Sequence, residues 1–356
     1  METDVNYSAY THSLKIDSGS FFKHIKDIIG WKQQFVFAPV ENISWREEFI
    51  SSIKILRNTY DNLNIMFSGG GDSLMTSLAF IEAGITDVHH TVWVFTDNGE
   101  VMHPRELNMG YKHLHRHNLK YTVQTVEINT FFDVWCNNPE YGKYTCLELD
   151  RALQLYMLAH TDSSWFNMIN EPTPSLTMRD GKRYLRNTFD QMLHMEFMKE
   201  FNIQGISRVY THTPALTTAW FHGTEMQDVM YKDSIEYSKA PSEMATGWNQ
   251  YKYTLYEKMY GFNVCEYYID KSTIQMWDNK KYLAKWHRLM DEGTLLKRST
   301  NLKMEIPYEL LHQSWVNETN EWFDYKDHAV STIDGPWHSA MGIEYGKSPF
   351  RGQNVI

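Results

Sequence analysis

The stretch of the sequence with the clearest chemical meaning is the hexapeptide Ser68-Gly69-Gly70-Gly71-Asp72-Ser73, called loop 68–73 below. Three consecutive glycines permit a tight turn and let backbone amides come close to an anion. The serine hydroxyls at its two ends can donate hydrogen bonds to phosphate oxygens. A carboxylate would repel bare phosphate, so Asp72 indicates a bound Mg²⁺ between the two. Loop 68–73 therefore predicts a nucleotide-phosphate site in which Asp72 holds the metal.

The segments on either side of the loop favour the same interpretation. Residues 63–67 form a short apolar run, which is typical of a buried strand. After the loop, Leu74, Leu78 and Ile81 recur at helical spacing until Gly84, a residue suited to position C′ of a helix. The unpaired N–H groups and the positive dipole end of that helix would face an anion on the loop. The alternative is a glycine-rich turn that binds nothing.

These motifs carry a resemblance to a known superfamily. Loop 68–73 resembles, residue for residue, the S-G-G-x-D-S signature of PP-loop ATP pyrophosphatases, members of the adenine-nucleotide alpha-hydrolase superfamily. Thr96-Asp97-Asn98-Gly99, followed by His103-Pro104-Arg105-Glu106, is similar to the D-T-G and F-P-E-T segments of phosphoadenylyl-sulfate (PAPS) reductase-like proteins. The resemblance covers residues 63–128. It implies a doubly wound parallel sheet that binds ATP through Ser68, Gly69, Gly70, Gly71, Asp72 and Ser73, with the adenine near Phe67, Thr96, Asp97 and Asn98.

The reaction that the resemblance implies is cleavage of ATP at the α-phosphate. A nucleophile from an unidentified acceptor would attack there, releasing pyrophosphate and leaving an adenylylated intermediate. The alternative is a sulfonucleotide enzyme. The sulfonucleotide reductases, however, resemble one another in a C-terminal Glu-Cys-Gly motif that carries a catalytic thiol, whereas Cys265 here is followed by Glu266 and Tyr267. A third possibility is a non-catalytic protein that binds a nucleotide or takes part in an assembly.

A basic cluster supplies two further candidate residues. It consists of Arg179, Lys182, Arg183 and Arg186, between the third and fourth expected strands. The chain there can pass over the carboxyl ends of a parallel sheet, where open α/β sheets bind ligands. A guanidinium at that edge could neutralise polyphosphate charge, which makes Arg183 and Arg186 candidate catalytic residues. A solvated basic loop explains the cluster equally well.

The expected elements alternate along the first two thirds of the chain, and this order predicts a Rossmann-like α/β fold with parallel strands and crossover helices. Strands are expected at 63–67, 91–96, 121–128 and 206–211, and helices from the capping box Ser44-Trp45-Arg46-Glu47, over 74–84, from Pro104, near 147–160 and near 189–201. Residues 1–43 read as an irregular extension and 44–215 as the nucleotide-binding domain. Residues 216–356 read as a mainly helical portion, with helical stretches around 248–260 and 278–292.

Histidines and cysteines in the sequence do not form a recognisable metal site. His113, His115 and His117 alternate on an expected helix, so successive members point apart and cannot share one metal. We expect them on the surface of that helix. Cys136 and Cys146 are ten residues apart without a second pair, and ordinary buried thiols are expected.

Bulk composition limits the partners and the compartment. The chain has 356 residues, with 34 Lys and Arg against 44 Asp and Glu, and a formal charge of −10, which disfavours a nucleic-acid partner. Three cysteines suit a reducing compartment. The acidic N-terminus lacks the pattern of a secretory signal, and no apolar run is long enough for a membrane span. A cytoplasmic protein that binds a small-molecule nucleotide is expected, and a homo-oligomer is left open.

Overall fold

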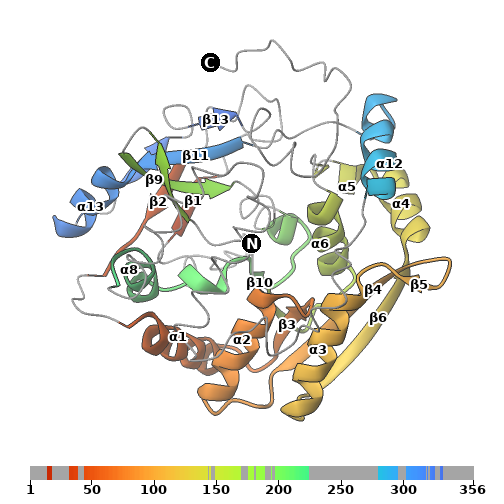
Figure 1. The fold of residues 1–356 in the computed structure, drawn as a ribbon, viewed down its shortest axis with the longest axis horizontal. Helices are drawn as coiled ribbons and strands as arrows, with labels where there is room; N and C mark the ends of the chain where they lie inside the picture. The colour runs from red at the N-terminus through yellow and green to blue at the C-terminus, as the bar shows by residue number, and fades with distance from the viewer. Residues whose placement is uncertain are drawn as a thin grey trace, which may run out of the picture.

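The computed structural model describes residues 14–17, 32–38, 44–142, 144–145, 149–169, 175–179, 182–188, 194, 197–223, 280–295, 302–317, 319, 321–324 and 329–331. These residues surround a central, mostly parallel sheet (Figure 1). Its strands are β3 (Leu63–Phe67), β4 (His89–Asp97), β5 (Glu100–Val101), β6 (Tyr121–Glu127), β7 (Phe166–Met168) and β10 (Gly205–Ile206).

The order of these strands is that of a doubly wound fold. Strands β10, β7, β3, β4 and β6 lie side by side in that order and are parallel, while β5 pairs antiparallel with the end of β4. The chain therefore starts in the middle of the sheet, moves outward through β4 to β6, and returns to the other side of β3 at β7. The predicted α/β doubly wound fold is confirmed. Ligands of such sheets bind where the direction of winding reverses, which here is between β3 and β7.

Helices cover both faces of this sheet. The helices of the described residues are α1 (Trp45–Thr59), α2 (Gly71–Glu82), α3 (Pro104–Arg116), α4 (Ile128–Asn137), α5 (Pro139–Gly142), α6 (Leu149–Ala159), α8 (Pro214–His222), α12 (Lys280–Asp291) and α13 (Tyr308–Val316), with a 3₁₀ turn, η3, at Val209–Thr211. On one face of the sheet, the ring of His90 in β4 hydrogen-bonds the hydroxyl of Ser77 in α2. The same hydroxyl hydrogen-bonds His113 in α3. Trp93, three residues on, points to the other face and contacts Tyr156 of α6. Successive strand residues alternate between faces, so the two layers follow directly from the strand.

The helix boundaries agree with the signals in the sequence. The Ser44 side chain caps α1 by accepting a hydrogen bond from the backbone N–H of Glu47. Helix α2 ends before Gly84, which has φ +76°, the left-handed conformation expected at C′. Pro104 stands in the first turn of α3, where its missing N–H costs no helical hydrogen bond. In the described part of the predicted helix 189–201, residues 194 and 197–200 are helical.

A buried polar network contributes to placing β7 beside β3. Asn64 is fully buried in β3, and its amide donates to Oδ1 of Asn167 in β7 at 2.8 Å. Oδ1 of Asn64 accepts from the hydroxyl of Thr91 in β4 at 2.9 Å. Buried amides that lose their partners are costly, so these bonds favour one order and one register of the three strands. Strand β7 was not predicted, because three residues are too few to show a period.

The predicted strand at 206–211 is wrong beyond Ile206. Only Gly205 and Ile206 pair with β7, and the chain then enters the 3₁₀ turn η3. The buried ring of His212 draws the chain away from the sheet, because it hydrogen-bonds the carbonyl oxygens of Val209 and Ser52. Thr213 then caps α8, and Pro214 occupies its first turn. The apolar residues of this stretch therefore predicted a strand, but side-chain hydrogen bonds impose a turn there.

Two antiparallel sheets lie beyond the expected elements. One joins β1 (Leu14–Asp17), β2 (Lys32–Phe35) and β12 (Trp322–Asp324), and the other joins β8 (Ser175–Arg179), β9 (Lys182–Thr188), β11 (Leu302–Pro307) and β13 (Ala329–Ser331). Residues 1–43 therefore contain strands where irregular structure was expected. The C-terminal portion contains the helices α8, α12 and α13, and α12 matches the expected stretch 278–292. The strands of that portion were not predicted, because they pair with residues far away in the sequence. The expected helix at 248–260 lies outside the described residues.

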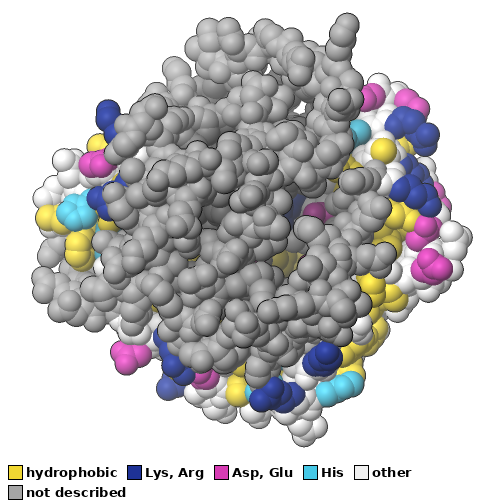
Figure 2. All heavy atoms as spheres, viewed as in Figure 1, with side chains coloured by type: hydrophobic (Ala, Val, Ile, Leu, Met, Phe, Trp, Pro, Cys, Tyr) yellow, Lys and Arg dark blue, Asp and Glu magenta, His cyan; other side chains and the backbone are white. Residues whose placement is uncertain are grey.

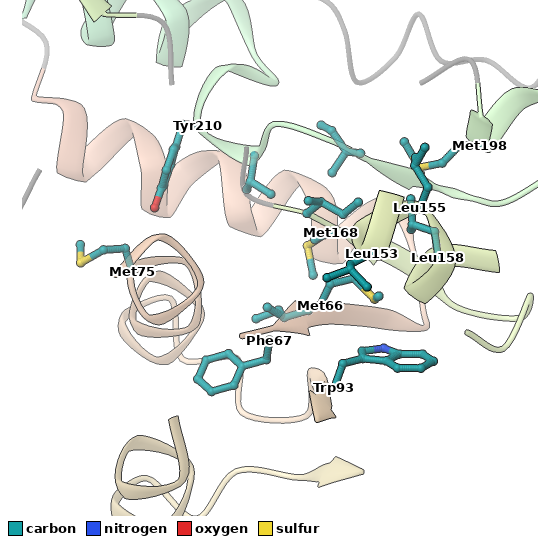
Figure 3. Close-up of a cluster of buried hydrophobic side chains, with 14 of the residues drawn as sticks. Met66, Phe67, Met75, Trp93, Leu153, Leu155, Leu158, Met168, Met198 and Tyr210 are labelled. Atoms are coloured by element: carbon teal, nitrogen blue, oxygen red, sulfur yellow. The ribbon is translucent and has the colours of Figure 1, made fainter. Parts of the chain in front are cut away.

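The hydrophobic core lies on both sides of the central sheet. Figure 3 shows side chains of α6 facing those of β3, β4 and β7, with Met66, Leu153 and Met168 close together. These three side chains are at least nine-tenths buried. This packing holds the carboxyl end of β3, and therefore loop 68–73, on a rigid base. In the described part of the chain, no helix is long and apolar enough to cross a membrane.

Candidate functional site

Loop 68–73 joins β3 to α2 at the carboxyl edge of the central sheet. Gly70 is the N-cap of α2 with φ −72° and ψ 165°, and the helix begins at Gly71. Asp72 and Ser73 therefore lie in the first helical turn. The first N–H groups of a helix have no intrahelical partner, so this end of α2 is suited to an anion. The strand, turn and helix that the sequence predicted are all confirmed.

Hydrogen bonds within the loop hold its shape. The Ser73 hydroxyl donates to the carbonyl oxygen of Gly70 at 3.0 Å, and the Gly70 amide donates to Oγ of Ser68 at 3.2 Å. The two serine hydroxyls are 3.3 Å apart. Ser73 is buried, whereas Ser68 is exposed. Ser73 therefore braces the turn, and the Ser68 side chain is the one of the two that solvent can reach.

Gly69 is the glycine that the fold requires most strictly. Its φ is +80°, and a Cβ atom added there would lie 2.1 Å from the carbonyl oxygen of Glu106 and 3.0 Å from the Cα of Gly110. The loop thus packs directly on the backbone of α3. Among the three glycines of the loop, the positive φ belongs to Gly69, whereas Gly70 has φ −72°. Two backbones in contact here leave no room for a side chain.

Tyr210 supports the loop from a segment distant in sequence. Its hydroxyl donates to the carbonyl oxygen of Asp72 at 2.9 Å. The ring is buried, is stacked parallel to that of Trp220, and also contacts Phe49. Tyr210 fixes the first turn of α2 relative to α1 and α8. Sequence reasoning missed this residue, because nothing in its neighbourhood points to a partner 138 positions earlier.

A carboxylate organises the end of β4 and the turn after it, where we placed the adenine. Glu127, at the end of β6, accepts hydrogen bonds from the hydroxyl of Thr96 and the backbone amides of Asn98 and Gly99, all between 2.9 and 3.1 Å. Asn98 has φ 52°, a left-handed conformation that asparagine tolerates. Thr96 is buried. The described contacts of Thr96 and Asn98 are therefore structural, and their contact with adenine stays a prediction.

Asp97 of the same segment is engaged by the C-terminal helix α12. Its Oδ2 is 3.0 Å from Nζ of Lys281. Hydrogen bonds from Tyr282 and Lys281 lower the pKa of Asp97 below its ordinary value. Helix α12 is anchored nearby, because the fully buried Trp286 packs on Phe132 and other aromatic rings of α4. Helix α12 of the C-terminal portion thus meets the central sheet at the end of β4.

Two buried histidines, His90 and His113, contact helix α2, which follows the loop. Nε2 of His90 and Nε2 of His113 are 2.9 and 2.8 Å from the hydroxyl oxygen of Ser77 in α2. Burial lowers the pKa of His90 to about 4 and that of His113 to about 3, so both rings are neutral near pH 7. Phe67, itself buried, stacks on His113. The expectation of three surface histidines is wrong for His113, because α3 turns this residue toward α2.

The ring of Phe67 is covered by these histidines, and this bears on its predicted role. Phe67 is 2% exposed and makes an edge contact with His90. Its ring is therefore packed in the core at the residue that immediately precedes the loop. The contact with adenine that we predicted for Phe67 stays a prediction.

The basic cluster lies on an antiparallel hairpin. Arg179 ends β8, while Lys182, Arg183 and Arg186 belong to β9. The guanidinium carbon of Arg183 is 4.1 Å from the ring centroid of Tyr308 in α13, a cation–π contact. Within the described contacts, none joins Arg183 to loop 68–73. The predicted catalytic roles of Arg183 and Arg186 remain predictions.

Arg208 is a second cation that the sequence did not single out. It lies two residues after the end of β10, so it is at the carboxyl edge of the same parallel sheet as the loop. Its side chain is only 1% exposed. Buried guanidinium groups occur where they meet carboxylates, phosphates or other acceptors. Burial is the signal that identifies Arg208, and burial is visible only in three dimensions.

The loop offers few protein ligands for a metal. Among the residues that the structure describes, no group of three or more His, Cys, Asp or Glu side chains is arranged to hold a metal ion. Asp72 is a half-exposed carboxylate in the first turn of α2. Mg²⁺ in nucleotide sites is commonly held by one or two carboxylates together with phosphate oxygens and water. The donor set fits a magnesium ion that arrives with its nucleotide.

Comparisons with known proteins leave the family open. No model of a protein family matches the chain, and no curated protein matches it. Among solved structures, a crystal structure of a predicted subunit of tRNA methyltransferase from Methanocaldococcus jannaschii is similar over 42% of this chain and 69% of that chain. The identity is 13% and the TM-score is 0.25. A likeness of this size carries no argument about activity.

Proposed function

We propose that loop 68–73 binds the phosphates of ATP and that the protein cleaves ATP at the α-phosphate to activate an acceptor. The observation that carries the proposal is the path from β3 through the glycine turn into α2, beside the point where the sheet reverses its winding. Nucleotide phosphates bind at this position in doubly wound folds. The sequence resemblance to PP-loop ATP pyrophosphatases supports the same assignment.

The residues at the loop can be given separate roles. The exposed Ser68 hydroxyl donates to a phosphate oxygen, and the first amides of α2 complete the anion site. Asp72 would hold Mg²⁺, and the ion would supply positive charge to offset that of the phosphates. Gly69 and Tyr210 position the turn through their contacts with α3 and Asp72. Positioning and charge stabilisation are what phosphoryl chemistry requires of a protein.

Neutralisation of the charge that develops at the α-phosphate needs a cation. Arg208 lies at the correct edge of the sheet and is buried. Arg183 and Arg186 belong to a different sheet, and Arg183 is in contact with Tyr308. We therefore place Arg208 first among the arginines for this role. Arg183 and Arg186 stay candidates for contact with the acceptor.

Thiol chemistry has less support than adenylyl transfer. Cys136 lies in α4, and burial raises the pKa of its thiol above the ordinary value. A raised pKa reduces the fraction of reactive thiolate at neutral pH. Cys146 and Cys265 lie outside the described residues. The PAPS reductase-like alternative therefore has less support here than cleavage of ATP at the α-phosphate.

The test is product analysis of ATP labelled at the α- and γ-phosphates after incubation with the protein and Mg²⁺. The proposal expects AMP, or an AMP adduct, together with pyrophosphate. Formation of ADP and phosphate would overturn cleavage at the α-phosphate. Tight binding of ATP without any product, in the presence of extracts that supply acceptors, would favour a non-catalytic nucleotide-binding protein.

A matched pair of variants shows whether the activity belongs to this site. Arg208→Gln should lower pyrophosphate release by on the order of tenfold or more, because the developing charge loses its cation. Arg116→Gln is the control, since Arg116 is exposed at the far end of α3. Arg208 is buried, so its variant is compared with the parent protein by thermal melting. A variant that folds normally and keeps full activity would remove Arg208 from the site.

A further inference from the structure

A two-residue turn joins β4 to β5 at the tip of an exposed hairpin. It consists of Asn98 and Gly99, with φ 52° and 81°, and the flanking residues Asp97 and Glu100 pair across the hairpin. Two successive residues with positive φ are typical of a type I′ turn, for which Asn-Gly is a preferred sequence. Asn98 and Gly99 are both exposed. Figure 1 draws the hairpin at the periphery, and Figure 2 shows acidic and basic side chains along the same right-hand rim.

An asparagine followed by glycine is open to a reaction between its side chain and the backbone. The backbone nitrogen of Gly99, once it has lost its proton to hydroxide, can attack Cγ of Asn98. The new C–N bond closes a five-membered succinimide, and the side-chain nitrogen takes a proton from water and leaves as ammonia. A second water then opens the ring to aspartate or isoaspartate. Glycine favours the attack because it has no Cβ atom in the way, and Asn98–Gly99 is the sole Asn-Gly dipeptide in the sequence.

A carboxylate holds the nitrogen that has to react. Oε1 of Glu127 accepts a hydrogen bond from the amide of Gly99 at 2.9 Å, and Oε2 accepts one from the amide of Asn98 at 3.1 Å. The side-chain amide of Asn98 donates to Oδ1 of Asp97 at 3.1 Å. Removal of the Gly99 proton in this state would set an amide anion against the Glu127 carboxylate, and like charges in contact repel. The reaction therefore requires the turn to leave Glu127 first.

We propose that Asn98 is a site of deamidation in this protein and that Glu127 sets how fast it reacts. The Gly99 nitrogen meets hydroxide only while the turn is open, so the rate follows the fraction of molecules in which the turn is open. Hydrogen bonds from backbone amides to a charged acceptor are among the stronger ones in proteins. Two of them on one half-exposed carboxylate keep that fraction small.

The product would change the charge of the hairpin. Asp97 and Glu100 already face each other across it, and Glu127 contacts its turn. A carboxylate at position 98 adds a further negative charge to this group, and isoaspartate also adds a main-chain carbon to a turn whose length fixes the register of the two strands. If the proposed nucleotide site is correct, the added charge lowers the affinity for anionic ATP. The deamidation itself does not depend on that site.

Mass spectrometry of peptides tests the proposal by following Asn98 while the folded protein is incubated at mildly alkaline pH. Exchange of the side-chain NH₂ for OH raises the mass, and chromatography separates aspartate from isoaspartate. Glu127→Gln keeps one acceptor oxygen and Glu127→Ala keeps none. The rate should therefore rise from the parent to Glu127→Gln to Glu127→Ala, by on the order of tenfold or more in total.

The matched control is Thr96→Val. It removes the third hydrogen bond to Glu127, from the Thr96 hydroxyl at 2.9 Å, but leaves both backbone amides bound, so Asn98 should react at the parent rate. Circular dichroism melts confirm that the variants are folded, and Glu127→Gln carries the test if Glu127→Ala is not. Equal or slower deamidation in the Glu127 variants, or equal acceleration in Thr96→Val, would overturn the role of Glu127. Faster deamidation of another asparagine in the Glu127 variants would overturn the choice of Asn98.

Discussion

At the residue scale, the glycines of loop 68–73 have different physical tasks. Gly69→Ala combines a left-handed φ with a Cβ atom 2.1 Å from a backbone carbonyl oxygen of α3. The left-handed conformation alone costs roughly 1–3 kcal/mol, and the contact adds to it. We predict a clear loss of stability in urea denaturation. Gly84→Ala is the control, because its φ is +76° but nothing lies within 4 Å of the added atom.

The Gly70→Ala variant then separates what ligand binding requires at this position from what folding requires. The φ of Gly70 is −72°, and the added Cβ atom meets only the movable Ser68 hydroxyl at 3.3 Å. Stability should change little. If phosphate contacts the amide of Gly70, ATP affinity should fall by on the order of tenfold, because the methyl group crowds the ligand. Unchanged affinity in calorimetry would place the phosphates elsewhere on the loop.

Asp72 is the residue on which the proposed role of magnesium depends. Asp72→Asn removes the charge that attracts the ion while keeping size and shape. We predict that Mg²⁺-dependent binding of ATP weakens by on the order of tenfold or more, with the melting temperature unchanged. Asp61→Asn is the matched control, since Asp61 is exposed just before β3 at the opposite end of the strand. Equal affinities of the two variants for Mg–ATP would contradict the assignment.

At the scale of elements, helices α2 and α3 meet strand β4 through neutral histidines, and this predicts a pH dependence of stability. The folded pKa of His90 is about 4, below the value of about 6.5 of an unfolded histidine. The unfolded chain therefore binds the proton first as pH falls. The stability that neutral His90 contributes is complete above pH 6.5 and is lost as pH decreases toward 4. The difference corresponds to about 3 kcal/mol for His90.

Urea denaturation at pH 7 and at pH 4.5 measures this loss. In His90→Gln the fall in unfolding free energy between the two pH values should be smaller than in the parent by about 2–3 kcal/mol. His113→Gln, which removes the second buried ring, should reduce the fall in the same direction. His115→Gln is the control, because His115 is exposed on the same helix. A parent protein and a His90→Gln variant with the same pH dependence would show that this histidine is not the cause.

At the scale of the whole molecule, the predicted boundary after residue 215 falls inside α8. This helix places Trp220 against Trp45 and Tyr210, with ring centroids 5.7 and 6.1 Å apart. Phe221 is fully buried as well. Tyr210 in turn holds Asp72 of the loop. Residues just beyond the predicted boundary thus complete the core beneath loop 68–73.

Two fragments test this dependence. A fragment of residues 44–215 should be less stable than one of residues 44–223 by on the order of 3 kcal/mol or more, because it lacks two buried aromatic rings. Urea denaturation, with near-ultraviolet circular dichroism as a second probe, measures the difference. Both fragments lose the pairing of β9 with β11, so the comparison is matched in that respect. Equal midpoints would mean that α8 belongs to a separate unit.

Local sequence was sufficient for the elements whose signals are local. Backbone preferences within a few residues predict the glycine loop, the cap at Ser44 and the C′ glycine at position 84. They also predict the strands on either side of the first crossover helices. The doubly wound class follows from their alternation. The conformation of the loop could be predicted for the same reason, because its parts are contiguous, whereas its binding of phosphate and magnesium stays a prediction.

Tertiary structure decided what depends on residues distant in sequence. The place of β7 beside β3, the contact of Tyr210 with Asp72, and the burial of His113 and Arg208 each require a neighbour far along the chain. The antiparallel sheets that join β2 to β12 and β9 to β11 have the same character. No local period encodes such pairings, because their free energy comes from contacts that form only when the chain closes long loops. The sequence by itself determined the strand, glycine turn and helix at residues 63–82, and the folded chain determined which residues surround the turn.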